Sequence, residues 1–419
     1  MATVMFDWEQ GGGLGHLMQT LPLAEGLARK GHRVFMAPRD LVAASALYDH
    51  KGVLFLPASH KEAMNGPVPC RRTLNFAHVL MNIGWDTDRS LEVLAGAWRN
   101  QFISIRPDAG VFDHGPTALL ASRGLPMKRI LIGSGFCCPP DTFPLPALVE
   151  GADVERLRAE ERLVLDRANR LLAAWRQPPL ERLGQLYSQV HENLLTTFEE
   201  LEQYPGRIGG EYWGPVIGPA SGIAPQWPAG EGPRVFGYLK RFKALPDLLK
   251  LLAEKACPTI AYIEGLDVKT RQQFQSPTLR IESQRLDLTR AARECDLAVL
   301  HAGQGSTAQV LLAGKPVLQI PLVLEQQLTA RAVAKLRAGE TASPTRPESI
   351  REKLEAMLAS DRYAAAARAF ARRHADFDPA AQVQRMVSRV EELLARRNGG
   401  AGLPMPTRGM SVPPGVFRA

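Results

Sequence analysis

Apolar and polar positions along the first 135 residues alternate between strand-like runs and helical patterns. Thr3–Trp8 is a short apolar run typical of a strand, and Leu17–Lys30 repeats apolar residues at the spacing of one helical face. Further strands are expected at Arg33–Ala37, Val53–Pro57, Ala109–Asp113 and Arg129–Gly133, with a helix around Thr117–Arg123. Strands that alternate with helices in this way predict a parallel, doubly wound sheet.

The second half of the chain repeats this alternation after a helical stretch. Glu150–Glu202 has mostly helical patterns and few strand signals, and a segment rich in Gly and Pro follows it. Strands are then expected at Arg234–Tyr238, Thr259–Ile263, Leu297–Leu300 and Val317–Ile320, and helices at Thr307–Ala313, Pro347–Leu358 and Gln382–Arg396. The 419 residues exceed what one hydrophobic core usually supports, so the two α/β halves predict two domains.

The predicted domain bounds follow from these patterns. We expect a Rossmann-like domain over residues 1–213, a linker over 214–233 and a second Rossmann-like domain over 234–380. A C-terminal helix over 381–397 is expected to pack back toward the first domain. Residues 398–419 are rich in Gly and Pro and lack periodicity, which predicts a disordered tail.

Composition narrows the class of protein. The chain has no run of eighteen apolar residues, and its first residues lack the basic start of a secretory signal, so we expect a cytoplasmic protein. Its 5 cysteines lack metal-ligand spacing and favour free thiols. The net charge of +8 is compatible with a solvated basic surface or with an anionic partner, either a membrane surface or substrate phosphates. Nucleic acid is not expected, because no basic–aromatic motif occurs.

A glycine-rich turn carries the first candidate chemistry. Gly11–His16 follows the first predicted strand and opens the first helix, which places His16 at the carboxyl edge of the sheet, where open α/β sheets bind ligands. An imidazole there can remove a proton from a hydroxyl as a general base. Asp113 ends another apolar strand and can orient that imidazole. The alternatives are a helix-capping histidine in a tight turn and, for Asp113, a helix N-cap.

A second loop suits a diphosphate. The run 295–307 leads from a strand into small residues and a helix start, where free N–H groups and the hydroxyls of Ser306 and Thr307 face an anion. His301 can donate a further hydrogen bond there. Glu325 and Gln326 follow the next strand, and an acid beside an amide suits sugar hydroxyls.

These motifs resemble the donor signature of the family-1-type (UDP-glycosyltransferase-like) nucleotide-sugar glycosyltransferases. The family pattern is H-G-G-x-G-[ST], a helix, G-x-P, and P-x-x-x-[DE]-Q. The chain has His301–Thr307, Gly314–Pro316, and Pro321 followed by Glu325 and Gln326. Gly15–His16 and the segment that follows them also match, so the resemblance covers most of 1–40, 105–135 and 295–335.

The resemblance implies a GT-B fold, in which two Rossmann-like domains face a central cleft, with the acceptor on the N-terminal side and the donor in the C-terminal domain. It implies an inverting, metal-independent hexosyltransferase without a cofactor, which moves a sugar from a UDP or dTDP donor to the hydroxyl of a small-molecule or lipid-linked acceptor. His16 is then the base and Asp113 its orienting group. The diphosphate is held by His301, Gly303, Gly305, Ser306 and Thr307, and the sugar by Glu325 and Gln326. Gly15 and Lys240 are further candidate donor contacts.

Departures from the pattern leave alternatives open. Ala302 replaces a glycine, and Gln19 stands where proline is common. The strand that usually ends in a Gly-Ser pair in this family ends here in Lys240, and no tryptophan-led motif for the nucleotide base is found. A catalytically silent nucleotide-sugar-binding protein remains an alternative, and a UDP-sugar 2-epimerase is a further one. Trp85 and Trp98 belong either to the core or to an acceptor pocket.

Overall fold

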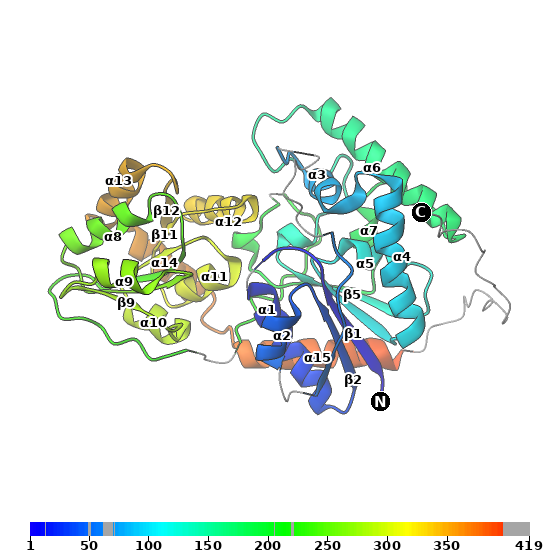
Figure 1. Ribbon diagram of the computed structural model, residues 1–419, viewed down its shortest axis with the longest axis horizontal. Coiled ribbons are helices and arrows are strands. Elements are labelled where there is room, and N and C mark those ends of the chain that lie inside the picture. Colours follow the sequence, from blue (N-terminus) through cyan, green and yellow to red (C-terminus); the bar gives the residue numbers. More distant parts are fainter. Residues whose placement is uncertain are drawn as a thin grey trace.

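Two α/β halves make up the protein, one on each side of the view in Figure 1. The computed structural model describes residues 1–12, 14–48, 52–61, 70, 72–204, 206–218 and 222–396. Each half contains one six-stranded sheet, and every strand pair in both sheets is parallel. The predicted fold class of two doubly wound α/β units is confirmed.

The N-terminal sheet has the strand order β3-β2-β1-β4-β5-β6. Its strands are β1 (Thr3–Trp8), β2 (Arg33–Pro38), β3 (Val53–Phe55), β4 (Ala109–Asp113), β5 (Lys128–Gly133) and β6 (Glu192–Leu195). In the register between β1 and β4, Trp8 is the partner of Asp113. The last residues of these two neighbouring strands therefore lie side by side at the carboxyl edge of the sheet.

The C-terminal sheet has the order β12-β11-β10-β7-β8-β9. Its strands are β7 (Val235–Lys240), β8 (Thr259–Glu264), β9 (Leu279–Glu282), β10 (Leu297–Leu300), β11 (Val317–Gln319) and β12 (Gly339–Thr341). The order reverses direction between β10 and β7, the kind of switch point at which α/β sheets leave a crevice for ligands. The loop after β10 is the predicted diphosphate loop.

Helices flank both sheets. The first half contains α1 (Gly15–Arg29), α2 (Leu41–Tyr48), α3 (Phe76–Leu80), the π-helical turn η1 (Met81–Trp85), α4 (Asp88–Ile105), α5 (Pro116–Ala121), the 3-10 turn η2 (Gly135–Cys137), α6 (Val154–Ala174), α7 (Gln185–Ser188) and the 3-10 turn η3 (Glu199–Leu201). The second half contains α8 (Leu245–Glu254), α9 (Val268–Phe274), α10 (Leu288–Glu294), α11 (Gln304–Leu312), α12 (Leu324–Lys335), α13 (Pro347–Leu358) and α14 (Arg362–Arg373).

The last described helix, α15 (Pro379–Ala395), returns to the N-terminal half and lies along it in Figure 1. Its buried Val383, Met386 and Val387 share one hydrophobic cluster with residues of α1 and β1. A Cβ at Gly26 of α1 would lie only 2.5 Å from Val387 Cγ2, so glycine permits this close crossing of the two helices. The predicted tail over 398–419 lies outside the described residues.

Three strands escaped the sequence analysis. β6 lies inside the stretch that was interpreted as mostly helical, which also contains α6, α7 and η3, and this short strand was not expected. β9 alternates buried Leu279 and Ile281 with more exposed charged residues, and β12 has only three residues. Such short strands carry little pattern of their own, and pairing with the neighbouring strand holds them in the sheet. Within the linker, the described residues 214–218 and 222–233 contain one parallel bridge, between Ile223 and Leu286.

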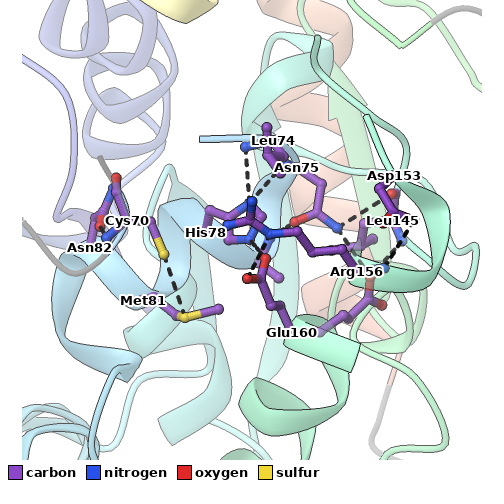
Figure 2. Close-up of polar contacts among 12 residues, drawn as sticks. Cys70, Leu74, Asn75, His78, Met81, Asn82, Leu145, Asp153, Arg156 and Glu160 are labelled. Carbon is purple, nitrogen blue, oxygen red and sulfur yellow. Dashed lines mark hydrogen bonds and ion pairs between the residues drawn. The ribbon is translucent and has the colours of Figure 1, made fainter. Parts of the chain in front are cut away.

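A buried histidine joins α3 to α6 on the N-terminal half (Figure 2). His78 Nδ1 accepts the N–H of Leu74 at 2.9 Å, so its Nε2–H donates to Glu160 of α6. Glu160 also accepts from Arg156 Nε at 2.9 Å. This network fixes the segment that leads into η1, and it lies on the side where acceptor contacts were expected.

Trp85 and Trp98 belong to the core. Both side chains have 0% exposure and share a hydrophobic cluster with β4 and α5. Trp85 Nε1 donates to Thr117 Oγ1 at 3.1 Å and Trp98 Nε1 to the carbonyl of Ser59 at 2.8 Å. All 5 cysteines, which fall within the described ranges, carry free thiols. None of the described helices is long and apolar enough to cross a membrane.

Candidate active site

The structure brings His16 and Asp113 together at the carboxyl edge of the N-terminal sheet. His16 Nδ1 lies 3.1 Å from Asp113 Oδ1 and 3.1 Å from Oδ2. A carboxylate only accepts hydrogen bonds, so Nδ1 carries the proton and Nε2 is left with a free lone pair. His16 is the second residue of α1 and Asp113 is the last residue of β4, so helix and strand position the pair together.

Aromatic rings and a glycine fix the orientation of His16. The Trp8 ring stacks on it with centroids 5.4 Å apart, and the His114 ring stacks on it at 5.7 Å. Gly11 has φ +89°, and a Cβ there would collide with His16 Nε2. Glycine at this position therefore satisfies both the turn and the close approach of the imidazole.

The electrostatics of the pair favour a protonatable His16. Burial by itself lowers the pKa of His16, but the charge and hydrogen bond of Asp113, with the charge of Glu325, outweigh it and raise that pKa above its ordinary value. Burial raises the pKa of Asp113, and the charge and hydrogen bond of His16 oppose this rise. The Asp113 side chain is fully buried, whereas His16 keeps 13% exposure toward the cleft.

Two further carboxyl groups lie beneath the pair. Glu9 accepts the N–H groups of Thr117 and Ala118 at the start of α5, and burial raises its pKa to about 8 despite these hydrogen bonds. Burial holds the pKa of Asp7 well above its ordinary value, and Glu9 and Asp113 raise it further when they are ionised. A group with a pKa of about 8 is mostly protonated at neutral pH, so Glu9 adds little negative charge there.

The second candidate loop lies at the N-terminus of α11. Gly303 is the N-cap residue and has no side-chain oxygen to cap the helix, so the first N–H groups of α11 remain free to meet an anion. Ser306 Oγ donates to the carbonyl of Gly303 at 3.1 Å. Thr307 points inward instead: its hydroxyl is fully buried and accepts from Gln319 Nε2 at 3.2 Å. Thr307 is not part of the cavity wall described below.

His301 has backbone partners on both ring nitrogens. Nδ1 lies 2.7 Å from the carbonyl of Ile320, and the N–H of Lys240 donates to Nε2 at 2.7 Å. The ring is therefore a neutral imidazole with its proton on Nδ1, and burial lowers its pKa. His301 joins the ends of β7 and β11, and neither ring nitrogen is free for a phosphate in this arrangement. The Lys240 ammonium lies 3.5 Å from Glu264 Oε2.

Glu325 and Gln326 lie in the first turn of α12. Ser134 Oγ donates to Glu325 Oε1 at 3.5 Å, and burial raises the pKa of this carboxyl. Gln326 Oε1 accepts the N–H groups of Leu322 at 2.7 Å and Val323 at 3.3 Å. Its oxygen is therefore used in capping the helix, and its NH₂ group remains for a ligand.

One cavity of about 360 Å³ joins these groups across the two halves. Its wall includes Gly15, His16, Lys240, His301, Gly303, Gly305, Ser306, Glu325 and Gln326. Asp113 and Thr307, the other two predicted site residues, lie behind the wall. The described residues contain no group of three or more His, Cys, Asp or Glu side chains that could hold a metal ion.

The wall also contains residues that the sequence analysis missed. Gln19 and Thr196 lie near the His16–Asp113 pair, and Gln304 opens α11. Residues 285–289 line the far end, where Leu286 lies in the bridge to Ile223. That loop follows β9, and the rule that ligands bind past strand ends would have identified it had β9 been recognised.

Polar contacts connect the two halves beside the cavity. Gln203 Nε2 donates to the carbonyl of Glu325 at 3.2 Å and to Thr329 Oγ1 at 3.0 Å. Gln304 Nε2 donates to Thr197 Oγ1, which lies just beyond β6. The diphosphate loop and α12 are therefore tied to the segment that follows β6.

Comparison with known proteins identifies the fold. No family model matches the chain, and no curated protein matches it by sequence. Among solved structures, it is similar to the calicheamicin glycosyltransferase CalG4 (17% identity, 94% of this chain and 98% of the other, TM-score 0.68). It is also similar to the glycosyltransferase VinC in complex with dTDP (15% identity, 94% of this chain and 100% of the other, TM-score 0.64). A third similar structure is the glycosyltransferase SnogD from Streptomyces nogalater (19% identity, 92% of this chain and 99% of the other, TM-score 0.61). These likenesses confirm the predicted GT-B fold.

Proposed function

We propose that the protein is an inverting glycosyltransferase that moves a sugar from a UDP or dTDP donor to an acceptor hydroxyl. One observation carries the proposal. His16, whose Nδ1–H donates to a buried carboxylate, lines the same cavity as the open N-terminus of α11. A base and an anion site within one cavity of about 360 Å³ suit a hydroxyl nucleophile and a diphosphate leaving group.

In this proposal the diphosphate binds at the start of α11. The first N–H groups of that helix donate to its oxygens, and the Ser306 hydroxyl does so once it turns from the Gly303 carbonyl. The positive helix end stabilises the charge that develops on departure. Gly303 and Gly305 let the diphosphate approach the backbone closely. The space that a Cβ at Gly305 would occupy has no protein atom within 4 Å, so it is open to the ligand. His301 acts by fixing the backbone of Lys240 and Ile320 beside this loop.

The donor sugar is assigned to the start of α12. The Glu325 carboxylate accepts from sugar hydroxyls, and the Gln326 NH₂ group donates to one. Gln326 Oε1 is taken by the N–H groups of Leu322 and Val323, so its amide orientation is fixed before the donor binds. The nucleoside then extends toward residues 285–289. The dTDP complex of VinC supports including a thymidine diphosphate donor.

The chemical step is a single displacement. His16 Nε2 takes the proton of the acceptor hydroxyl while its oxygen attacks the anomeric carbon of the donor. The bond from that carbon to the diphosphate oxygen breaks, and the electron pair leaves with the nucleoside diphosphate. Attack opposite the leaving group inverts the anomeric centre. Asp113 accepts the hydrogen bond from Nδ1–H and stabilises the imidazolium that forms.

Nucleotide release from a panel of UDP-, dTDP- and GDP-sugars without added acceptor tests the proposal, because a transferase slowly hydrolyses its donor. We expect release from one UDP or dTDP donor, lost by about 10²–10⁴-fold in His16→Ala, with donor affinity within about twofold of the wild type. Donor binding without release, in the presence or absence of a hydroxylated acceptor panel, would favour a silent binding protein. Loss of donor binding together with turnover in His16→Ala would contradict the role of His16 as the base.

A further inference from the structure

A second cavity of about 530 Å³ lies on the N-terminal half, where β1, β2 and β3 end. We propose that it holds the acceptor, and that the acceptor is a largely apolar hydroxy compound whose carboxylate is bound by Arg39. This inference rests on the proposed glycosyl transfer and adds a substrate class to it. The wall includes Trp8, Pro38, Leu41 and Pro57 as apolar residues, with Arg39, Asp40 and His60 as polar ones.

The cavity adjoins the general base. Gly12 lines both this cavity and the first one, which is assigned to the donor, so the two cavities meet at the glycine turn. Trp8 lies in the wall and stacks on His16, and Gly11, also in the wall, lies directly against His16 Nε2. A ligand in the second cavity can therefore present a hydroxyl beside Nε2 while its body remains outside the donor site.

Arg39 supplies a positive charge that has no ion-pair partner among the described residues. Its side chain is half-buried after β2, and no carboxylate in the described part of the chain forms an ion pair with it. The adjacent Asp40 is exposed and accepts the N–H of Ala43 at 2.9 Å, so it caps α2 instead. A guanidinium held near a cavity suits a carboxylate, which it binds through two parallel hydrogen bonds.

The charge of Arg39 also acts on groups near the base. Burial chiefly lowers the pKa of His114 to about 3, and the positive charges of His16 and Arg39 contribute in the same direction. Arg39 lines the same cavity as Trp8 and Gly11, which contact His16, so one molecule can place a carboxylate at Arg39 and a hydroxyl at His16.

The rest of the wall suits an apolar body. Leu41 is 39% exposed and Val42 is 80% exposed at the start of α2, and Pro57 and Ala58 line the same cavity. His60 Nδ1 lies 3.3 Å from the carbonyl of Ala58, which fixes the ring. The large exposure of two aliphatic side chains beside a cation is explained by a ligand that is apolar along one part and anionic at one end.

The test compares acids with their neutral esters. Binding to the full chain, with and without saturating dTDP, is measured for 4-hydroxybenzoate, 4-hydroxycinnamate and 6-hydroxy-2-naphthoate, each against its methyl ester. For at least one pair we expect the wild type to bind the acid about tenfold more tightly, the size of one charge-assisted hydrogen-bond pair. In Arg39→Gln the ratio of the affinity for the acid to the affinity for its ester is expected to fall to about one. In Arg39→Lys this acid-to-ester ratio lies between one and the wild-type value.

The matched control is Arg89→Gln. Arg89 is an exposed arginine of α4 whose contact is Glu92, at 3.5 Å, so the acid-to-ester ratio is expected to stay at the wild-type value. Equal binding of acid and ester in all three pairs, or an unchanged ratio in Arg39→Gln, would overturn the inference. Donor hydrolysis is measured separately: its absence together with failed nucleotide binding removes the proposed function, whereas acid selectivity that depends on Arg39 still supports the anion site.

Discussion

Gln19 donates from its side-chain amide to Asp113 Oδ1 at 3.3 Å, so the carboxylate that orients His16 is itself held from α1. The other end of the same amide accepts from Thr196 Oγ1 at 2.8 Å. His16, Asp113, Gln19 and Thr196 thus form one chain of hydrogen bonds from the cavity into the N-terminal half. In the sequence Gln19 was a departure from the family pattern; in the structure it supports the proposed base.

Asp113→Asn is expected to lower turnover and to shift its pH dependence. Turnover requires unprotonated His16, and the pKa of His16 is raised, so the wild-type rate should fall as pH decreases through a value above 6.5. Without the carboxylate charge, burial remains as the main influence and lowers the His16 pKa. The acid limb of donor hydrolysis should therefore move to lower pH while the plateau rate falls by about 10²-fold or more.

The control for this variant is Asp166→Asn, on the exposed face of α6. It should leave both the plateau and the acid limb where they are in the wild type. An unshifted acid limb in Asp113→Asn with a normal plateau would mean that Asp113 has a structural role alone.

Gln19→Leu should produce a smaller form of the same effect. It removes one hydrogen bond to a carboxylate, a loss of about 1 kcal/mol, which corresponds to roughly fivefold in rate. Asp113 keeps its charge, so the acid limb should stay above 6.5. The pH profile of donor hydrolysis measures both quantities, and a rate equal to that of the wild type would show that Gln19 does not position Asp113.

Parts of this site could be predicted because each follows an apolar strand. Asp113 ends one strand with a clear pattern, and His16 and the loop before α11 follow two others. Parallel strands bring such positions to the carboxyl edge of each sheet. Thr196 escaped because β6 was taken as helical. The orientation of His301 could not be predicted, because its partners are backbone groups of Lys240 and Ile320, which belong to other strands.

The same reasoning explains how much of the fold was predicted. Thr3–Trp8, Ala109–Asp113 and Leu297–Leu300 have the predicted bounds because each is a mainly apolar run that is buried on both faces of its sheet. β12 has only the run Gly339–Thr341, and its place depends on pairing with β11. Local pattern cannot carry that information, since the partner strand lies twenty residues away in the sequence.

Donor binding should not strengthen at low pH through His301. Burial lowers the pKa of this ring below its ordinary value, and its nitrogens are bonded to backbone groups, so acid is not expected to charge it readily. The measurement uses dTDP-glucose or UDP-glucose, whose diphosphate does not titrate in this range, and a His16→Ala background to remove the other histidine of the cavity. Affinity is expected to change by less than about twofold between pH 6 and 8. A rise of several-fold toward pH 6, lost in His301→Asn, would instead identify a cationic phosphate contact.

Glu9→Gln is expected to stabilise the protein increasingly as pH rises. The pKa of Glu9 is raised from 4.5 to about 8 in the folded state, so between these values the unfolded chain ionises Glu9 while the folded protein keeps it protonated. Stability of the wild type therefore decreases with pH in this window, by at most about 1.4 kcal/mol per pH unit from this group, and glutamine does not titrate. Urea unfolding at pH 5, 6, 7 and 8 should show the variant gaining on the wild type at each step. Glu231→Gln, at an exposed linker position, should keep a constant difference, and a constant difference in Glu9→Gln would mean that Glu9 is ionised in the folded protein.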